Sequence, residues 1–69
     1  MLILFQEEIV LNLSNTNGFI LDEKTIVFYF ENKSDKKFYF RDEKEAKEAF
    51  DLIIDAIKYE KSFLELKDF

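Results

Sequence analysis

The stretch TIVFYFENKSDKKFYF, residues 25–40, decides the fold of this chain. Large apolar and aromatic side chains alternate with period two on both sides of a polar turn. This alternation is the pattern of two antiparallel strands, each with one buried face. The sequence therefore predicts a hairpin with strands at 25–30 and 37–41.

The register of this hairpin follows from its phenylalanines. A slip of one residue would turn every side chain to the opposite face, so the Phe residues of both strands must share one side of the sheet. We expect Phe30 to lie opposite Phe38, and Phe28 opposite Phe40, across a loop at 33–35. We expect this Phe face to form the core.

The other face of the hairpin combines aromatic and basic residues. We expect Tyr29 to lie opposite Tyr39, with Lys37 and Arg41 beside them. This composition is typical of a platform on which the bases of single-stranded nucleic acid stack. Tyrosine also suits an exposed strand without any function, and the same face would serve equally as a protein or self interface.

Shorter apolar runs predict further strands at 2–5, 9–13 and 19–21. The segment SNTNG, 14–18, separates two of them and is a strong loop signal, because Asn-Gly adopts positive φ without steric cost. The count is four or five strands, depending on whether 2–5 and 9–13 are separate. The predicted fold is α+β, with one antiparallel β-meander.

A single helix is predicted over 42–61. Asp42 is a favourable N-cap, and Glu45 three residues later completes a capping-box pattern. An apolar stripe at helical spacing is expected to cover the Phe face of the sheet; its members are Ala46, Ala49, Phe50, Ile53 and Ile57. Residues 62–69 are interpreted as a short extra helix or a tail.

A second apolar stripe is offset from the first by helical geometry. Its members are Leu52, Ala56, Tyr59, Phe63 and Leu66. Packing on one sheet needs only one stripe. Three interpretations of the second stripe remain open: a larger core wrapped by the tail, a dimer interface, or a groove for a foreign partner.

The residue types exclude most enzyme chemistry. The chain has no cysteine and no histidine, and Gly18 is the only glycine, so thiolate sites, His-based catalysis and glycine-rich phosphate loops are absent. Glu48, Asp51 and Asp55 form an acidic row at helical spacing, where they could hold a divalent cation or attract a basic partner, but nearby lysines favour a solvated face. We expect no enzyme activity, no cofactor and no metal.

The net charge and the first five residues limit the classes of partner and the cellular compartments that we expect. The net charge is −5, which argues against broad binding to nucleic acid without excluding it, although residues 25–41 alone sum to +2. The opening MLILF is too short for a membrane span and lacks the basic start of a signal peptide. We expect a cytoplasmic protein of a bacterial cell or of a phage host, without a membrane partner.

The stretch from residue 25 to residue 57 resembles the second half of many short uncharacterised bacterial and phage proteins. In these proteins an aromatic or aliphatic hairpin runs into the pattern F-x-x-x-x-E-A, here Phe40, Glu45 and Ala46, and then into one helix. The resemblance implies a sheet meander covered by a single helix. The order of strands and helix also looks like that of Whirly-type binders of single-stranded DNA, whose basic character this chain lacks.

These observations favour one small domain over 1–69, with a sheet over 1–41 and the helix over 42–61. The leading functional hypothesis is an acidic, non-enzymatic protein-binding module. It would act as a homodimer, in the manner of a phage or mobile-element accessory or inhibitor protein that occludes a surface. The alternatives are a single-stranded nucleic-acid binder and a structural subunit of a larger assembly.

Overall fold

The computed structural model describes residues 1–67 and 69. Its elements, in chain order, are β1 (Leu2–Phe5), β2 (Ile9–Asn12), the 3-10 turn η1 (Leu13–Asn15), β3 (Gly18–Asp22), β4 (Thr25–Tyr29), β5 (Lys36–Tyr39), α1 (Glu43–Lys58) and β6 (Phe63–Leu66). The α+β class is confirmed. The single meander is wrong, because the strands form two separate sheets of three: sheet A, in the order β2-β1-β6, and sheet B, in the order β3-β4-β5.

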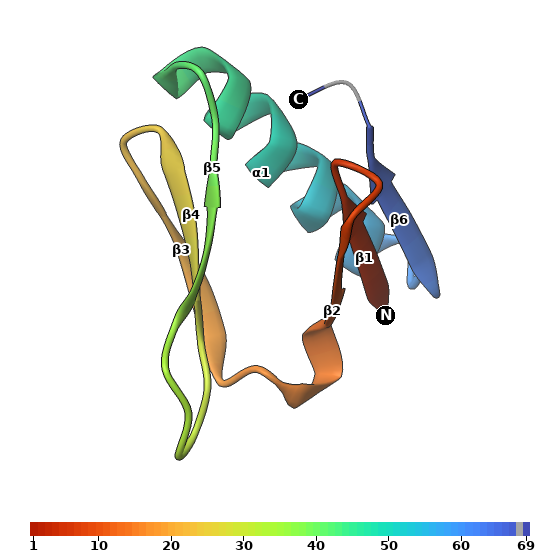
Figure 1. The fold of residues 1–69 in the computed structure, drawn as a ribbon. Helices are drawn as coiled ribbons and strands as arrows, with labels where there is room; N and C mark the ends of the chain where they lie inside the picture. The colour runs from red at the N-terminus through yellow and green to blue at the C-terminus, as the bar shows by residue number, and fades with distance from the viewer. Residues whose placement is uncertain (68) are drawn as a thin grey trace.

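Sheet A joins segments from the two ends of the described chain. β1 and β2 form an antiparallel hairpin, and β6 lies parallel to β1 on its other side, with Leu2 beside Phe63 and Phe5 beside Leu66. The short helix or tail predicted at 62–69 is therefore wrong over Phe63–Leu66, and the sheet is not confined to 1–41. Figure 1 shows β6 beside β1.

The helix ends before the expected residue 61, and its termination explains how β6 forms. Glu60 has the left-handed φ of 54°, which no helix continues. The Lys61 N–H donates to the carbonyl of Ala56, and the Glu60 N–H to that of Ile57, so the final carbonyls are satisfied. The chain then turns back along β1. At the other end the prediction is confirmed: Asp42 Oδ1 accepts the N–H of Glu45 at 2.8 Å.

Sheet B is a true meander, but the register of its hairpin differs from the prediction by four residues. Phe38 lies opposite Ile26, and Lys36 opposite Phe28, so the loop runs from residue 30 to residue 35. A shift of four is even, so each Phe keeps its predicted face. Asn32 sits in the longer loop with φ of 64°, a conformation that asparagine tolerates better than most residues.

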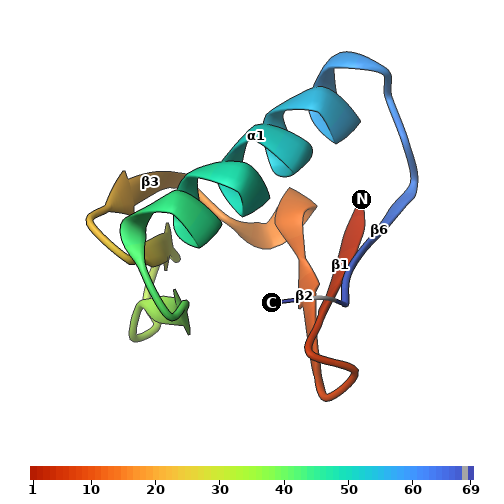
Figure 2. The same ribbon diagram turned by 90° about the horizontal axis from the view of Figure 1, so that it is seen from above.

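The core lies where the two sheets and the helix meet. The rings of Phe5 on sheet A and Phe38 on sheet B stack at a centroid distance of 4.2 Å, and Phe28 packs on Phe38 at 4.8 Å. Figure 2 shows α1 extending across both sheets, and it contacts β3, β4 and β6. The fully or nearly fully buried cluster consists of Ile3, Phe5, Leu11, Ile26, Phe28, Phe38, Phe40, Ala46, Ala49, Ile53 and Leu66.

The helix stripe that was predicted to cover the Phe face is mostly confirmed. Ala46, Ala49 and Ile53 are buried and Phe50 is half-buried, whereas Ile57 is exposed. Small alanines at the contact allow the helix to approach the large Phe rings closely. Over the residues that are described, no helix is long and apolar enough to cross a membrane.

Candidate functional site

The outer face of sheet B does not bring the two tyrosines together. Tyr39 lies opposite Thr25, and Tyr29 opposite Gly18 on the neighbouring strand, so the expected Tyr29–Tyr39 pair is wrong. Four residues along a strand separate their rows, which is roughly 13 Å. Both side chains are exposed, but they are two isolated aromatic positions and not one stacking platform.

The space between the tyrosine rows is filled by ordinary sheet packing. Val27 points to this outer face, yet only 6% of it is exposed. Its cross-strand neighbours on the same face are Ile20 and Lys37, whose side chains lie beside it in register. The centre of the predicted platform therefore offers no open aromatic surface.

Arg41, the last predicted member of the platform, is engaged elsewhere. Its Nε donates to Glu45 Oε2 at 2.8 Å, and the same two side chains form an ion pair. The hydrogen bond from Arg41 lowers the pKa of the Glu45 carboxyl, and the bond to Glu45 raises the pKa of the Arg41 guanidinium. This pair links the first turn of α1 to Arg41, in the short segment between β5 and α1.

The acidic row of the helix lies on an exposed surface, as its spacing requires. Glu48, Asp51 and Asp55 are all exposed, and Asp51 accepts a hydrogen bond from Lys47 Nζ at 2.6 Å. Over residues 1–67 and 69, no three acidic side chains are grouped closely enough to hold a metal ion. Whether this face attracts a basic partner stays a prediction.

The second apolar stripe is split between two elements. Leu52 and Tyr59 belong to the helix and its C-cap and are exposed, whereas Phe63 and Leu66 belong to β6. Leu66 is fully buried in the core, so it is not available to a partner in this structure. Phe63 points the other way, to the outer face of sheet A, and 51% of it is exposed.

The outer face of sheet A is an apolar surface that sequence analysis missed. Strand alternation and the observed register place Leu2, Leu4, Val10, Asn12, Phe63 and Glu65 on it. Leu2 and Val10 are exposed, at 43% and 65%, and Leu2 lies directly beside Phe63. The alternation of Val10 against Ile9 and Leu11 was a visible signal, but the assignment of Phe63 to a helix concealed the third strand.

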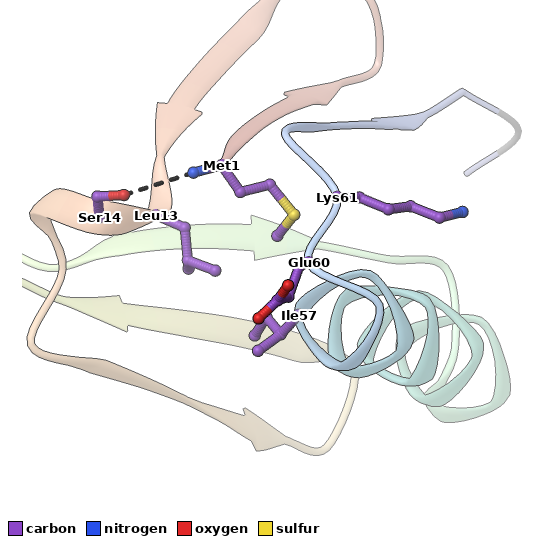
Figure 3. Close-up of a pocket in the computed structure, with 6 residues that line it drawn as sticks. All are labelled: Met1, Leu13, Ser14, Ile57, Glu60 and Lys61. Carbon is purple, nitrogen blue, oxygen red and sulfur yellow. Dashed lines mark hydrogen bonds between the residues drawn. The ribbon is translucent and has the colours of Figure 1, made fainter.

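A hollow of about 310 Å³ lies between η1 and the end of α1 (Figure 3). Its lining is Met1, Leu13, Ser14, Ile57, Glu60 and Lys61. The side chains of Met1, Leu13 and Ile57 face the same space, whereas the Lys61 side chain extends away from it. The Ser14 hydroxyl accepts a hydrogen bond from the Met1 nitrogen at 3.4 Å.

A second hollow, of about 280 Å³, lies between the free edge of β2 and the loop that joins β4 to β5. We call it the strand-edge pocket; its lining is Val10, Leu11, Asn12, Asn15, Phe30, Lys33, Ser34 and Lys36. It combines two ammonium groups, a hydroxyl and two amides with one aromatic ring. The sequence predicts a hairpin loop at 33–35, but local patterns could not show that this loop approaches β2.

No protein-family model, no curated protein and no solved structure matches this chain.

Proposed function

We propose that this chain is a small non-enzymatic protein-binding module that docks through the outer face of sheet A, with a second copy of the chain as the occupant. One observation carries the proposal. Apolar side chains from three strands, Leu2, Leu4, Val10 and Phe63, share one face, and three of them are exposed. Exposed apolar side chains grouped in this way are typical of interaction surfaces.

The charge distribution supports a second copy as the occupant. The chain carries a net charge of −5, so two copies repel each other in most orientations. Among the described residues of the three strands, Glu65, at the β6 edge, is the only charged one on the outer face of sheet A, because β1 and β2 contribute Leu2, Leu4, Val10 and Asn12. A face with so little charge is compatible with itself around a two-fold axis, where each patch meets its own copy.

The size of the face sets the expected affinity. Three strands of four residues cover roughly 200 Å² in projection, from strand spacing and rise. A stable interface buries roughly 800 Å² on each partner. The face alone is roughly a quarter of that area, so we expect weak, concentration-dependent self-association.

Sedimentation equilibrium over roughly 10 µM to 1 mM tests this proposal, a range that brackets weak association. We expect the average mass of the wild-type chain to rise with concentration, and Phe63→Glu to remain a monomer throughout. The matched control is Ile20→Glu, which introduces the same charge at a similarly exposed residue on the outer face of sheet B. It should associate like the wild type, and circular dichroism checks that both variants fold.

Two results would contradict the proposal. A wild-type chain that stays monomeric at the highest concentration removes the second copy as the occupant. Association that survives Phe63→Glu but disappears in Ile20→Glu moves the interface to sheet B.

A further inference from the structure

We infer that the strand-edge pocket binds an extended peptide segment that carries acidic side chains. The segment would add to sheet A along β2 through its backbone, and it would place a carboxylate against Lys33 and Lys36. This site adjoins the self-association face proposed above and shares Val10 and Asn12 with it, but Phe63 lies on β6, at the opposite edge of sheet A, and does not line the pocket.

The backbone of β2 presents unused hydrogen-bonding groups to the pocket. The Leu13 N–H donates to the Met1 carbonyl oxygen at 2.9 Å, so the odd-numbered residues of this ladder bond to β1. The N–H and C=O groups of Val10 and the N–H of Asn12 therefore point away from β1, whereas the Asn12 carbonyl belongs to the N-cap of η1. Within the described part of the chain, no strand pairs with β2 on that side.

The lining residues show that the pocket follows this edge. Val10, Leu11 and Asn12 are consecutive, and their side chains alternate between the two faces of the sheet. A hollow that touches all three lies alongside the strand rather than over one face. Addition of an extended peptide to such an edge is a recurrent mode of recognition, in which the backbone supplies affinity and side chains supply specificity.

The opposite wall of the pocket selects for negative charge. Lys33 and Lys36 contribute ammonium groups, and the ion pairs found among the described residues involve neither of them. Ser34 and Asn15 add further donors beside them. The Asn12 side-chain oxygen already accepts the N–H of Ser14 at 3.1 Å, which leaves its amide NH₂ to donate.

The loop also limits the strength of the attraction. Glu31 and Asp35 lie in the same loop and are exposed, although neither lines the pocket. Their charges oppose those of the lysines at long range, so the preference for acid arises at contact distance and binding should be weak. Phe30 adds an apolar contact that a peptide side chain can use and a free inorganic anion cannot.

A titration followed by ¹⁵N-HSQC spectra tests this inference directly. The protein is the Phe63→Glu variant, which we expect to be monomeric. Peptide binding is therefore measured without self-association, and the two proposals are tested independently. The probe is the peptide acetyl-Glu-Val-Glu-Val-Glu-amide, added up to about 1 mM. We expect the largest shifts at the amides of Val10 and Asn12 and in the loop at 33–36, and weaker binding by the matched peptide in which Gln replaces Glu.

Three variants separate the contributions of charge, backbone and side chain. Lys33→Gln/Lys36→Gln should weaken binding by about tenfold, while Lys44→Gln/Lys58→Gln, which changes the net charge equally on the helix, should not. Val10→Pro removes the outward N–H of an edge residue without breaking the β1 ladder, and it should abolish the shifts at Asn12 and in the loop at 33–36, since the proline itself gives no amide signal. Val10→Ala keeps the N–H and should retain them.

Several results would overturn the inference. No shift at Val10 or Asn12 at the highest peptide concentration removes the strand-edge mode. Equal binding of the Glu and Gln peptides removes the charge selection. Sodium phosphate that reproduces the same shifts, with no further effect of the peptide, would reassign the pocket to a free anion.

Discussion

The Glu45 carboxylate accepts hydrogen bonds from both the side chain and the backbone of Arg41, while the Glu45 N–H donates to Asp42. A single residue in the first turn therefore connects the helix to the residue that precedes its cap. The hydrogen bond from Arg41 lowers the pKa of Glu45 below its ordinary value of 4.5. A lowered pKa in the folded state means that ionised Glu45 stabilises the fold above that value.

Glu45→Gln should therefore lower the urea midpoint at pH 7 and have less effect in acid. The stabilisation by Glu45 is complete above about pH 4.5, and it is lost as the pH falls through the lower pKa of the folded state. Urea titrations of the wild type and of Glu45→Gln at a series of pH values measure the difference between their midpoints. Glu48→Gln, on the exposed helix surface, is the control; a constant difference for Glu45→Gln across the series would contradict the argument.

Glu60 has a left-handed backbone that only glycine adopts without steric cost, with φ of 54°. We predict that Glu60→Gly increases the free energy of unfolding by roughly 0.5–1 kcal/mol, measured by urea denaturation. Glu48→Gly, in the helix interior, should decrease it by about 1 kcal/mol. If both substitutions change the free energy of unfolding in the same direction, the left-handed conformation of Glu60 does not determine where the helix ends.

At the scale of elements, β6 contributes to the core rather than forming a loose end. Leu66 is fully buried and Phe63, in the same strand, is half exposed on the other face. Leu66→Ala should therefore cost roughly 2–5 kcal/mol of unfolding free energy, because it leaves a cavity beside the core of both sheets. Phe63→Ala should cost much less, and equal losses in denaturant unfolding would show that β6 is not docked as described.

The elements that sequence could predict are those whose signals are local. The cap at Asp42, the apolar helix face and the Phe face of sheet B all follow from periodicity and side-chain chemistry within a few residues. β6 could not be predicted in this way. The pattern FLEL fits a helix as well as a strand, and its strand state depends on β1 at the other end of the described chain.

The same distinction between local and distant signals applies to the candidate surfaces. Individual exposures were predictable, such as those of Tyr39 and the acidic helix row, because they follow from alternation or helical spacing. Groupings were not. The outer face of sheet A needs β6 beside β1, and the strand-edge pocket needs the loop at 30–35 beside β2, and both are contacts between segments that are distant in sequence.

At the scale of the whole molecule, a few aromatic rings join two sheets that do not pair with each other. Phe5 and Phe38 stack almost in parallel, with 9° between their ring planes, and both are buried. A domain of this length has roughly 3–10 kcal/mol of stability. Loss of one of these rings should therefore affect sheet A and sheet B together.

Phe38→Ala should remove roughly 3–5 kcal/mol and accelerate amide exchange in both sheets to a similar extent. Hydrogen exchange followed residue by residue measures this. Tyr39→Ala, next in the sequence but on the outer face, should leave exchange in sheet A unchanged. Faster exchange in sheet B alone would show that the two sheets are stabilised independently.

The parallel pairing of β1 with β6 also governs the order in which the chain can fold. β1 leaves the ribosome before every other strand described, and its second neighbour leaves after all of them. Contacts between such distant segments slow folding, because the entropy of closing the loop is lost before they form. During synthesis β1 therefore lacks one of its two neighbouring strands until the helix has been completed, and Ile3 and Phe5 stay without that side of their sheet for most of the chain's emergence.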